Sequence, residues 1–122
     1  MENTNEINYF DQAIDDYKRG TTKLQEQLPE MTKGFFHFTE EAFKEGTIDK
    51  KTKQLIALAI SIYAQDEYCI IYHTKGAVEH GAEQKEIMET LAISAALGGG
   101  AAFAQAVTLA LDTFDHYQQR LH

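Results

Sequence analysis

Hydrophobic residues recur at helical spacing along most of the chain. Between residues 7 and 18 the apolar positions lie three or four apart, which predicts an amphipathic helix that ends at Gly20. A second helix is predicted over about residues 29–44, with Pro29 in its first turn. Residues 50–65 are apolar almost all round, and this pattern predicts a central, buried helix.

The second half of the chain contains three further helical patterns. Asp66 is the predicted N-cap of a helix over residues 67–80, which Gly81 ends. The next helix is predicted over residues 83–97, and the glycine triplet after it predicts a break or a tight bend before a last helix over residues 101–120. Inward positions are expected at Ile87, Leu91 and Ile93, and one apolar face is expected at Phe103, Val107, Leu111 and Phe114.

These patterns predict an all-α protein with six or seven helices in a compact bundle. No segment alternates with the period of two that marks a half-buried strand. A helix that is apolar on every side is difficult to bury within 122 residues. We therefore expect the chain to form a homo-oligomer.

The charge of the chain limits its partners. It has 11 Lys and Arg residues against 19 Asp and Glu residues, which gives a net charge of −8. Nucleic-acid binders neutralise phosphates with clustered basic side chains, whereas here the basic residues are scattered. We expect neither a nucleic acid nor an anionic membrane surface as a partner.

Composition also sets an expectation for the compartment. No apolar run approaches the ~20 residues needed to cross a bilayer, and the first six residues are polar and acidic, unlike a signal peptide. The single cysteine excludes a disulfide within the chain and agrees with a reducing environment. These features predict a cytoplasmic protein.

Candidate chemistry centres on Cys69, the only cysteine, and on His73 four residues later. On a helix these positions share one face, so a thiol and an imidazole there have the arrangement of a nucleophile and its base. A helix N-terminus capped by Asp66 favours a thiolate, whereas the carboxylates of Asp66 and Glu67 oppose it, so the direction of the pKa shift stays open. The alternative is a buried cysteine that acts as a small hydrophobe beside a structural histidine.

The remaining candidate chemistry is weaker. Tyr68 and Tyr72 flank the cysteine and are either hydrogen-bond donors to a substrate or half-buried aromatic residues. His73 and His80 have no HExxH, CxxC or paired-carboxylate pattern beside them, so no metal site is predicted. The glycine triplet lacks the spacing of a phosphate-binding loop, and we expect no cofactor.

Several short motifs together resemble the carboxymuconolactone decarboxylase family, which includes the alkyl hydroperoxidase D-like proteins. The motifs are Lys53–Ala59, Tyr68–Ile70, His73–Thr74, Ala77, Gly81–Ala82, Glu86–Ile87 and Gly98–Gly100. The resemblance implies an N-terminal helical extension over residues 1–28 and an all-helical family domain over residues 29–122. It also implies assembly into trimers or hexamers with the active site near a subunit contact.

The resemblance also assigns roles to residues. Its hydroperoxidase members use a CxxC pair, a histidine four residues after the second cysteine, and a relay glutamate on the preceding helix. Cys69 and His73 match the second cysteine and the histidine, whereas Asp66 stands at the first cysteine position and Gln54 at the relay position. Without a second thiol, Cys69 cannot close a short intrachain disulfide, so turnover requires an external thiol reductant or a second subunit.

Three functional hypotheses follow from the residues and the resemblance. The first is a peroxiredoxin-like, thiol-dependent antioxidant enzyme with Cys69 as nucleophile, His73 as base, and Gln54 and Asp66 orienting the site. The second is a lyase for a small lactone or carboxylic acid that uses His73 with Tyr68 or Tyr72. The third is an oligomeric scaffold without catalysis.

Overall fold

All the regular structure in the described part of the chain is helical. The computed structural model describes residues 8–121, and no strand occurs among them. The elements are α1 (Tyr9–Gln27), α2 (Pro29–Phe43), α3 (Lys50–Ala64), α4 (Glu67–Glu79), α5 (Gln84–Gln105), the π-helical turn η1 (Ala106–Ala110) and α6 (Leu111–Leu121). The predicted all-α class is therefore confirmed.

The number of helices is smaller than predicted. Helices α5 and α6 join through η1 with no loop between them, so the described residues form five continuous helical segments rather than six or seven. The backbone of Gly99 is non-helical, with φ 78° and ψ −159°, and it kinks α5 without ending it. The glycine triplet thus forms the predicted tight bend, and the helix resumes directly after it.

Polar caps begin the helices that follow α2. Asp49 accepts a hydrogen bond from the N–H of Thr52 at 2.8 Å, and Asp66 caps α4 in the same way. Glu83 begins α5 with a capping box to Glu86. These contacts confirm that local side-chain chemistry sets the starts of the helices.

The end of α1 differs from its prediction. Helix α1 continues through Gly20 to Gln27, because an isolated glycine costs a helix only about 1 kcal/mol and does not by itself end it. The helix ends at Leu28, with φ −133° and ψ 67°, since the following Pro29 disfavours the α conformation there. Ile7, which was expected in this helix, lies outside the described residues.

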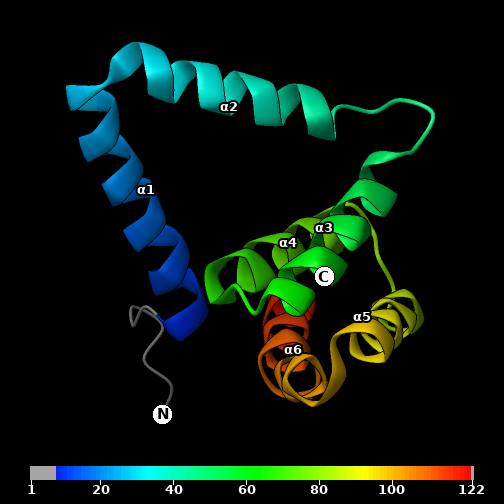
Figure 1. The fold of residues 1–122 in the computed structure, drawn as a ribbon. Coiled ribbons are helices and arrows are strands. Elements are labelled where there is room, and N and C mark those ends of the chain that lie inside the picture. The colour runs from blue at the N-terminus through cyan, green and yellow to red at the C-terminus, as the bar shows by residue number, and fades with distance from the viewer. Residues whose placement is uncertain (1–7, 122) are drawn as a thin grey trace. The chain divides into compact units, whose positions relative to one another are not determined.

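The chain divides into two compact units, Met1–Ala42 and Phe43–His122. Within the first unit, α1 and α2 diverge from the turn at Leu28 (Figure 1). In the second unit, α3 packs against α4 and α5, and α4 also packs against η1 and α6. Its core consists of fully buried aliphatic side chains, namely Leu58, Ile62, Ile70, Ile71, Val78 and Ile87.

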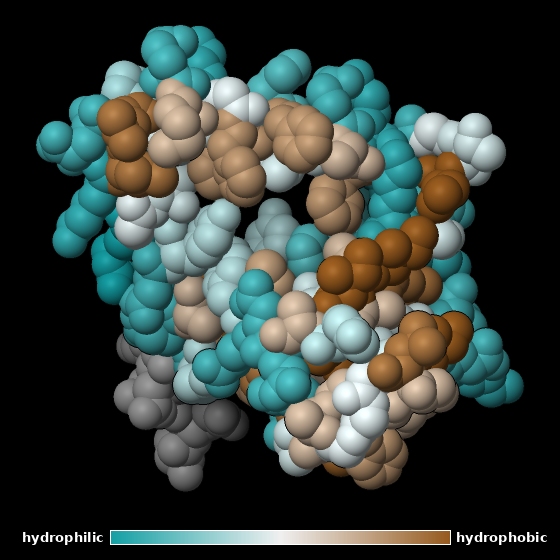
Figure 2. All heavy atoms as spheres, viewed as in Figure 1, coloured by the Kyte–Doolittle hydropathy of each residue, from teal (hydrophilic) through white to brown (hydrophobic). Residues whose placement is uncertain are grey.

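Helix α3 is only partly buried, which corrects the expectation of a helix covered on every side. Leu58 and Ile62 are inaccessible to solvent, whereas Ile60 and Tyr63 are 62% and 59% exposed. Figure 2 shows hydrophobic residues gathered on the face of the molecule where α3 and α5 lie. One apolar face of α3 therefore has no cover within the described chain.

Two predicted inward positions also lie outside the core. Ile93 is 60% exposed although its neighbours Ile87 and Leu91 are buried. Phe103 is 56% exposed whereas Phe114 is buried, because the wider π turn between them shifts the helical register. The spacing of three and four therefore does not keep these residues on one face.

One described stretch, Gln84–Arg120, is long and apolar enough, by length and composition alone, to cross a membrane. This finding corrects the expectation that no run approaches that length. The kink at Gly99 divides the stretch, and the part before the kink, at about 22 Å, is shorter than the ~30 Å hydrocarbon core. Length and composition therefore give only weak support for a membrane-spanning role.

Candidate functional site

The first turn of α4 places Cys69 beside Asp66. The Oδ1 atom of Asp66 accepts a hydrogen bond from the backbone N–H of Cys69 at 3.2 Å, as an N-cap does. Cys69 is half-buried in this first turn. The capping carboxylate and the only thiol of the chain are therefore neighbours.

One turn further along α4, His73 is held from the preceding helix. Its Nδ1 atom lies 2.9 Å from Oε1 of Gln54 on α3. A carbonyl oxygen only accepts hydrogen bonds, so Nδ1 is the protonated ring nitrogen and Nε2 keeps its lone pair. His73 and Cys69 are four residues apart, so both residues lie on one face of α4.

Aromatic side chains enclose the imidazole. The ring of Phe43 stacks on His73 with a centroid distance of 5.3 Å and an interplanar angle of 12°. Tyr72 meets His73 edge-on at 5.1 Å, and Tyr68 stacks on Tyr72 at 5.7 Å. The two tyrosines thus extend an aromatic wall from the histidine along the exposed side of α4.

The environment keeps both groups neutral at pH 7. Burial, followed by the neighbouring Asp66 carboxylate that accepts the thiol hydrogen and repels a thiolate, raises the pKa of Cys69 to about 12. Burial also lowers the pKa of His73, although the negative charge of Asp66 opposes that shift. The pKa shift of Cys69, whose direction the sequence leaves open, is therefore upward. The resting site holds a thiol and a neutral imidazole.

The residues expected at the site form two groups. Asp66 and Cys69 form the first. His73 is the centre of the second, where it contacts Gln54 and Tyr72, and Tyr68 stacks on Tyr72. The sequence did not single out Phe43, which stacks on His73, or Gly76, whose missing Cβ leaves room for the amide of Gln54. Gly76 was detectable as a glycine inside a helix, because such residues usually have a packing reason.

The basic side chain nearest to His73 in the sequence already has an acidic partner. Lys75, the nearest basic residue in the sequence, pairs with Glu79 at 2.5 Å and lies 5.7 Å from the centroid of the Tyr117 ring. Among residues 8–121 no three His, Cys, Asp or Glu side chains form a group that could hold a metal ion. The side chains present are suited to proton transfer and thiol chemistry rather than to anchoring a carboxylate.

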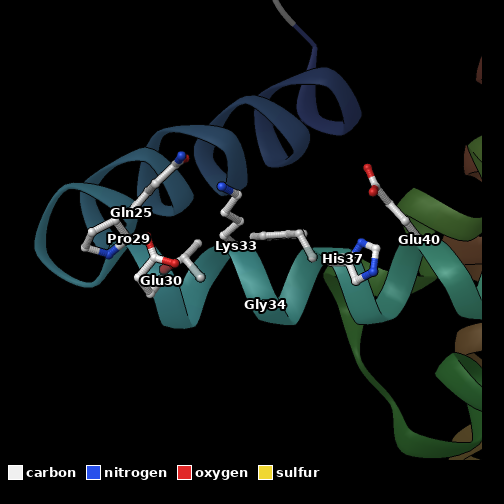
Figure 3. A pocket seen from close by; sticks show the side chains of 9 residues that line it. Gln25, Pro29, Glu30, Lys33, Gly34, His37 and Glu40 are labelled. Atoms are coloured by element: carbon white, nitrogen blue, oxygen red, sulfur yellow. The ribbon is translucent and has the colours of Figure 1, made fainter.

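Two hollows lie away from these residues. The first, about 950 Å³, belongs to the first unit and is lined mostly by polar residues of α2 (Figure 3). Its one buried side chain, Thr32, already donates to the carbonyl of Leu28 at 2.7 Å. The second is an apolar groove of about 360 Å³ between α3 and α5, lined by Ala59, Ile60, Tyr63, Ile93, Ser94 and Leu97.

Comparison with known proteins gives one matching family model. The model of the carboxymuconolactone decarboxylase family matches residues 29–112. A protein of the cox locus of Paracoccus denitrificans is 42% identical over 72 residues, which are 59% of this chain and 65% of that relative. A Cupriavidus necator protein is 30% identical over 77 residues, covering 63% of this chain and 68% of its own length. The matched stretch thus spans just under two thirds of the Paracoccus relative.

Solved structures share the fold. An apo protein of the same family from Legionella pneumophila aligns with a TM-score of 0.85 and 33% identity, covering 89% of this chain and 96% of the other. A Thermotoga maritima family protein, for which involvement in the antioxidative response has been suggested, aligns with a TM-score of 0.70 and 27% identity. That alignment covers 84% of this chain and 92% of the Thermotoga protein.

Proposed function

This chain belongs to the carboxymuconolactone decarboxylase family, and from that membership we propose that it is a thiol-dependent antioxidant protein that reduces peroxides through Cys69. The observation that carries the proposal is a free thiol four residues before a histidine on the same helix, with the histidine held by Gln54. The antioxidative role suggested for the Thermotoga relative agrees with it.

The raised pKa of Cys69 shapes the proposed mechanism. At pH 7 the thiol is protonated, so deprotonation accompanies the attack rather than preceding it. As the sulfur attacks the distal oxygen of the peroxide, the thiol proton passes to Nε2 of His73 and the O–O bond breaks. The departing alkoxide takes this proton from Nε2 of His73, and the products are an alcohol and a sulfenic acid on Cys69.

The regeneration step requires a reductant from outside the chain. The sequence contains a single cysteine, so no second thiol of the same chain is available to attack the sulfenic acid. One external thiol condenses with the sulfenic acid and releases water, and a second thiol then releases Cys69 and leaves as a disulfide. A small dithiol or a redox protein satisfies this requirement.

Steady-state peroxide consumption tests the proposal. We expect the wild-type protein to consume cumene hydroperoxide in the presence of dithiothreitol, Cys69→Ser to abolish turnover, and His73→Ala to lower it by about 10²-fold or more. Met88→Ala, an exposed change on α5, is the matched control. Full turnover by Cys69→Ser would overturn the antioxidant function.

A specific observation also supports a second candidate, a lyase of small acids or lactones. A neutral imidazole beside a protonated thiol can transfer protons without any sulfur chemistry. The ion pair of Lys75 with Glu79 weighs against this candidate, because it occupies the nearest cation that a substrate carboxylate would need. The lyase predicts that Cys69→Ser stays active on a lactone acid while His73→Ala does not.

We further propose that the apolar groove between α3 and α5 is covered by a second copy of the chain. Five side chains on these helices, Ile56, Ile60, Tyr63, Ile93 and Leu97, are 44–77% exposed. By their usual sizes they expose on the order of 500 Å², more than half of the ~800 Å² that one partner contributes to a standard interface. The expected trimer or hexamer would cover this surface.

A further inference from the structure

Gly76 lies inside α4, three residues after His73, and is buried. A glycine inside a helix lowers helix stability, so a close neighbour usually explains its presence. Here the neighbour is the side chain of Gln54. A Cβ at residue 76 would overlap Oε1 of Gln54 and come within 2.7 Å of its Cδ. The amide of Gln54 therefore occupies the space that any other residue at position 76 would fill.

This contact also selects which end of the amide faces α4. The Cα–H of a glycine is a weak donor that suits a carbonyl oxygen, whereas an NH₂ group would press hydrogen against hydrogen. Oε1 is the atom nearest the missing Cβ and also the atom 2.9 Å from Nδ1 of His73. One oxygen thus lies against the Gly76 backbone and accepts the proton of Nδ1.

We propose that Gly76 is a positioning residue: it admits the Gln54 amide against α4 and thereby fixes His73 with its proton on Nδ1 and its lone pair on Nε2. The inferred tautomer rests on the amide oxygen facing both Gly76 and Nδ1. The use of Nε2 to receive the Cys69 proton rests on the proposed antioxidant function.

Gly76→Ala separates a positioning role from a structural one. The added methyl group meets the far end of a flexible side chain, so Gln54 can swing aside while the helix stays folded. We expect a cooperative thermal transition like that of the wild type, together with loss of the hydrogen bond to His73. A glycine needed only for packing would show the opposite pattern, with a weakened fold and an unchanged histidine.

The direct readout is the tautomer of His73 in long-range ¹H–¹⁵N NMR spectra of protein labelled at histidine. The signal that disappears in His73→Ala identifies the residue among the five histidines. We expect the wild type to show protonated Nδ1 and unprotonated Nε2. Gly76→Ala and Gln54→Ala should both shift His73 toward protonated Nε2, and the double variant should match the single ones.

Gly100→Ala is the matched control, because a Cβ there meets nothing within 4 Å. It should leave the His73 signals unchanged. A wild-type His73 protonated on Nε2, or an unchanged tautomer in Gly76→Ala, would overturn the proposal. If the tautomer behaves as expected while the wild type consumes no peroxide, the antioxidant function fails and the positioning role of Gly76 stands.

Discussion

Gln54 on α3 and His73 on α4 are joined by a hydrogen bond of 2.9 Å between Oε1 and Nδ1. The bond connects two helices whose residues are 19 positions apart in the chain. It fixes the orientation of the imidazole without placing a charge beside it. An amide stands where the hydroperoxidase relatives are expected to have a glutamate, so this site orients the base without supplying a second carboxylate.

Gln54→Glu tests how an uncharged partner at residue 54 affects the pKa of His73. A carboxylate bonded to Nδ1 stabilises the imidazolium, so we expect the pKa of His73 to rise by about 1 unit or more. A ¹H–¹⁵N NMR pH titration of His73 measures the shift. The exposed change Gln118→Glu adds the same charge elsewhere and should leave the pKa of His73 nearly unchanged. An unchanged pKa in Gln54→Glu would contradict the observed contact.

The reactivity of Cys69 should be low in the native protein. With a pKa of about 12, the thiolate fraction at pH 8 is more than about 100-fold below that of the unfolded chain. Iodoacetamide labelling with and without denaturant measures the ratio. Asp66→Asn keeps a capping residue but removes the charge, so native labelling should accelerate, although burial still protects the thiol. Native labelling as fast as that of the unfolded chain would contradict the raised pKa.

Cys69 should also make stability depend on alkaline pH. Its folded pKa of about 12 lies above the value of 9.0 for an unperturbed cysteine, so folding favours the protonated thiol. This contribution to stability is complete below pH 9 and is lost as the pH rises from about 9 to about 12. The free energy of unfolding, measured by denaturant titration, should therefore fall more steeply with pH in that window for the wild type than for Cys69→Ser. Parallel pH profiles for the two proteins would contradict this linkage.

The cap at the start of α4 should contribute measurably to stability. Asp66→Ala removes the acceptor of the Cys69 N–H, and we expect a loss of about 1 kcal/mol in the free energy of unfolding. Asp66→Asn should recover most of that loss because an asparagine side chain also caps. Chemical denaturation at pH 7 compares the three proteins, and equal losses in both variants would argue against a capping role.

The groove between α3 and α5 should control the oligomeric state. Leu97 is 77% exposed, and Leu97→Asp places a charge on the surface proposed to contact a second copy. We expect this variant to run as a smaller species than the wild type in size-exclusion chromatography with light scattering. Met88→Asp, an exposed apolar position on the same helix outside the groove, is the matched control. A wild-type monomer would contradict the proposed contact.

Local chemistry explains why several helix starts were predictable from the sequence. Pro29 acts through its own backbone and Asp66 through an N–H group three residues away, so their roles are visible in a short window. Gly20 misled the prediction of where α1 ends, because a single glycine weakens a helix without ending it, whereas the bend at the triplet 98–100 was predicted. Apolar periodicity likewise marked Ile93 as inward, although it cannot distinguish a core from an uncovered face.

The site was only partly accessible from the sequence for a different reason. Cys69 and His73 share one helix, so their spacing was sufficient to pair them. The stacking of Phe43 on His73 and the fit of Gln54 against Gly76 depend on how separate helices pack. No local pattern encodes such contacts. The direction of the pKa shift of Cys69 likewise required the depth of burial and the contact with Asp66, which both raise it.

The cap formed by Asp66 limits the redox chemistry that this helix can carry. Residue 66 serves α4 as an acceptor, yet it is also the position where a second thiol would complete a CxxC pair. A cysteine there is a poor cap, so gaining a self-contained disulfide cycle would weaken the first turn of the helix that carries the nucleophile. A helix cap and a self-contained disulfide cycle therefore need different side chains at residue 66, and this chain has the side chain that caps the helix.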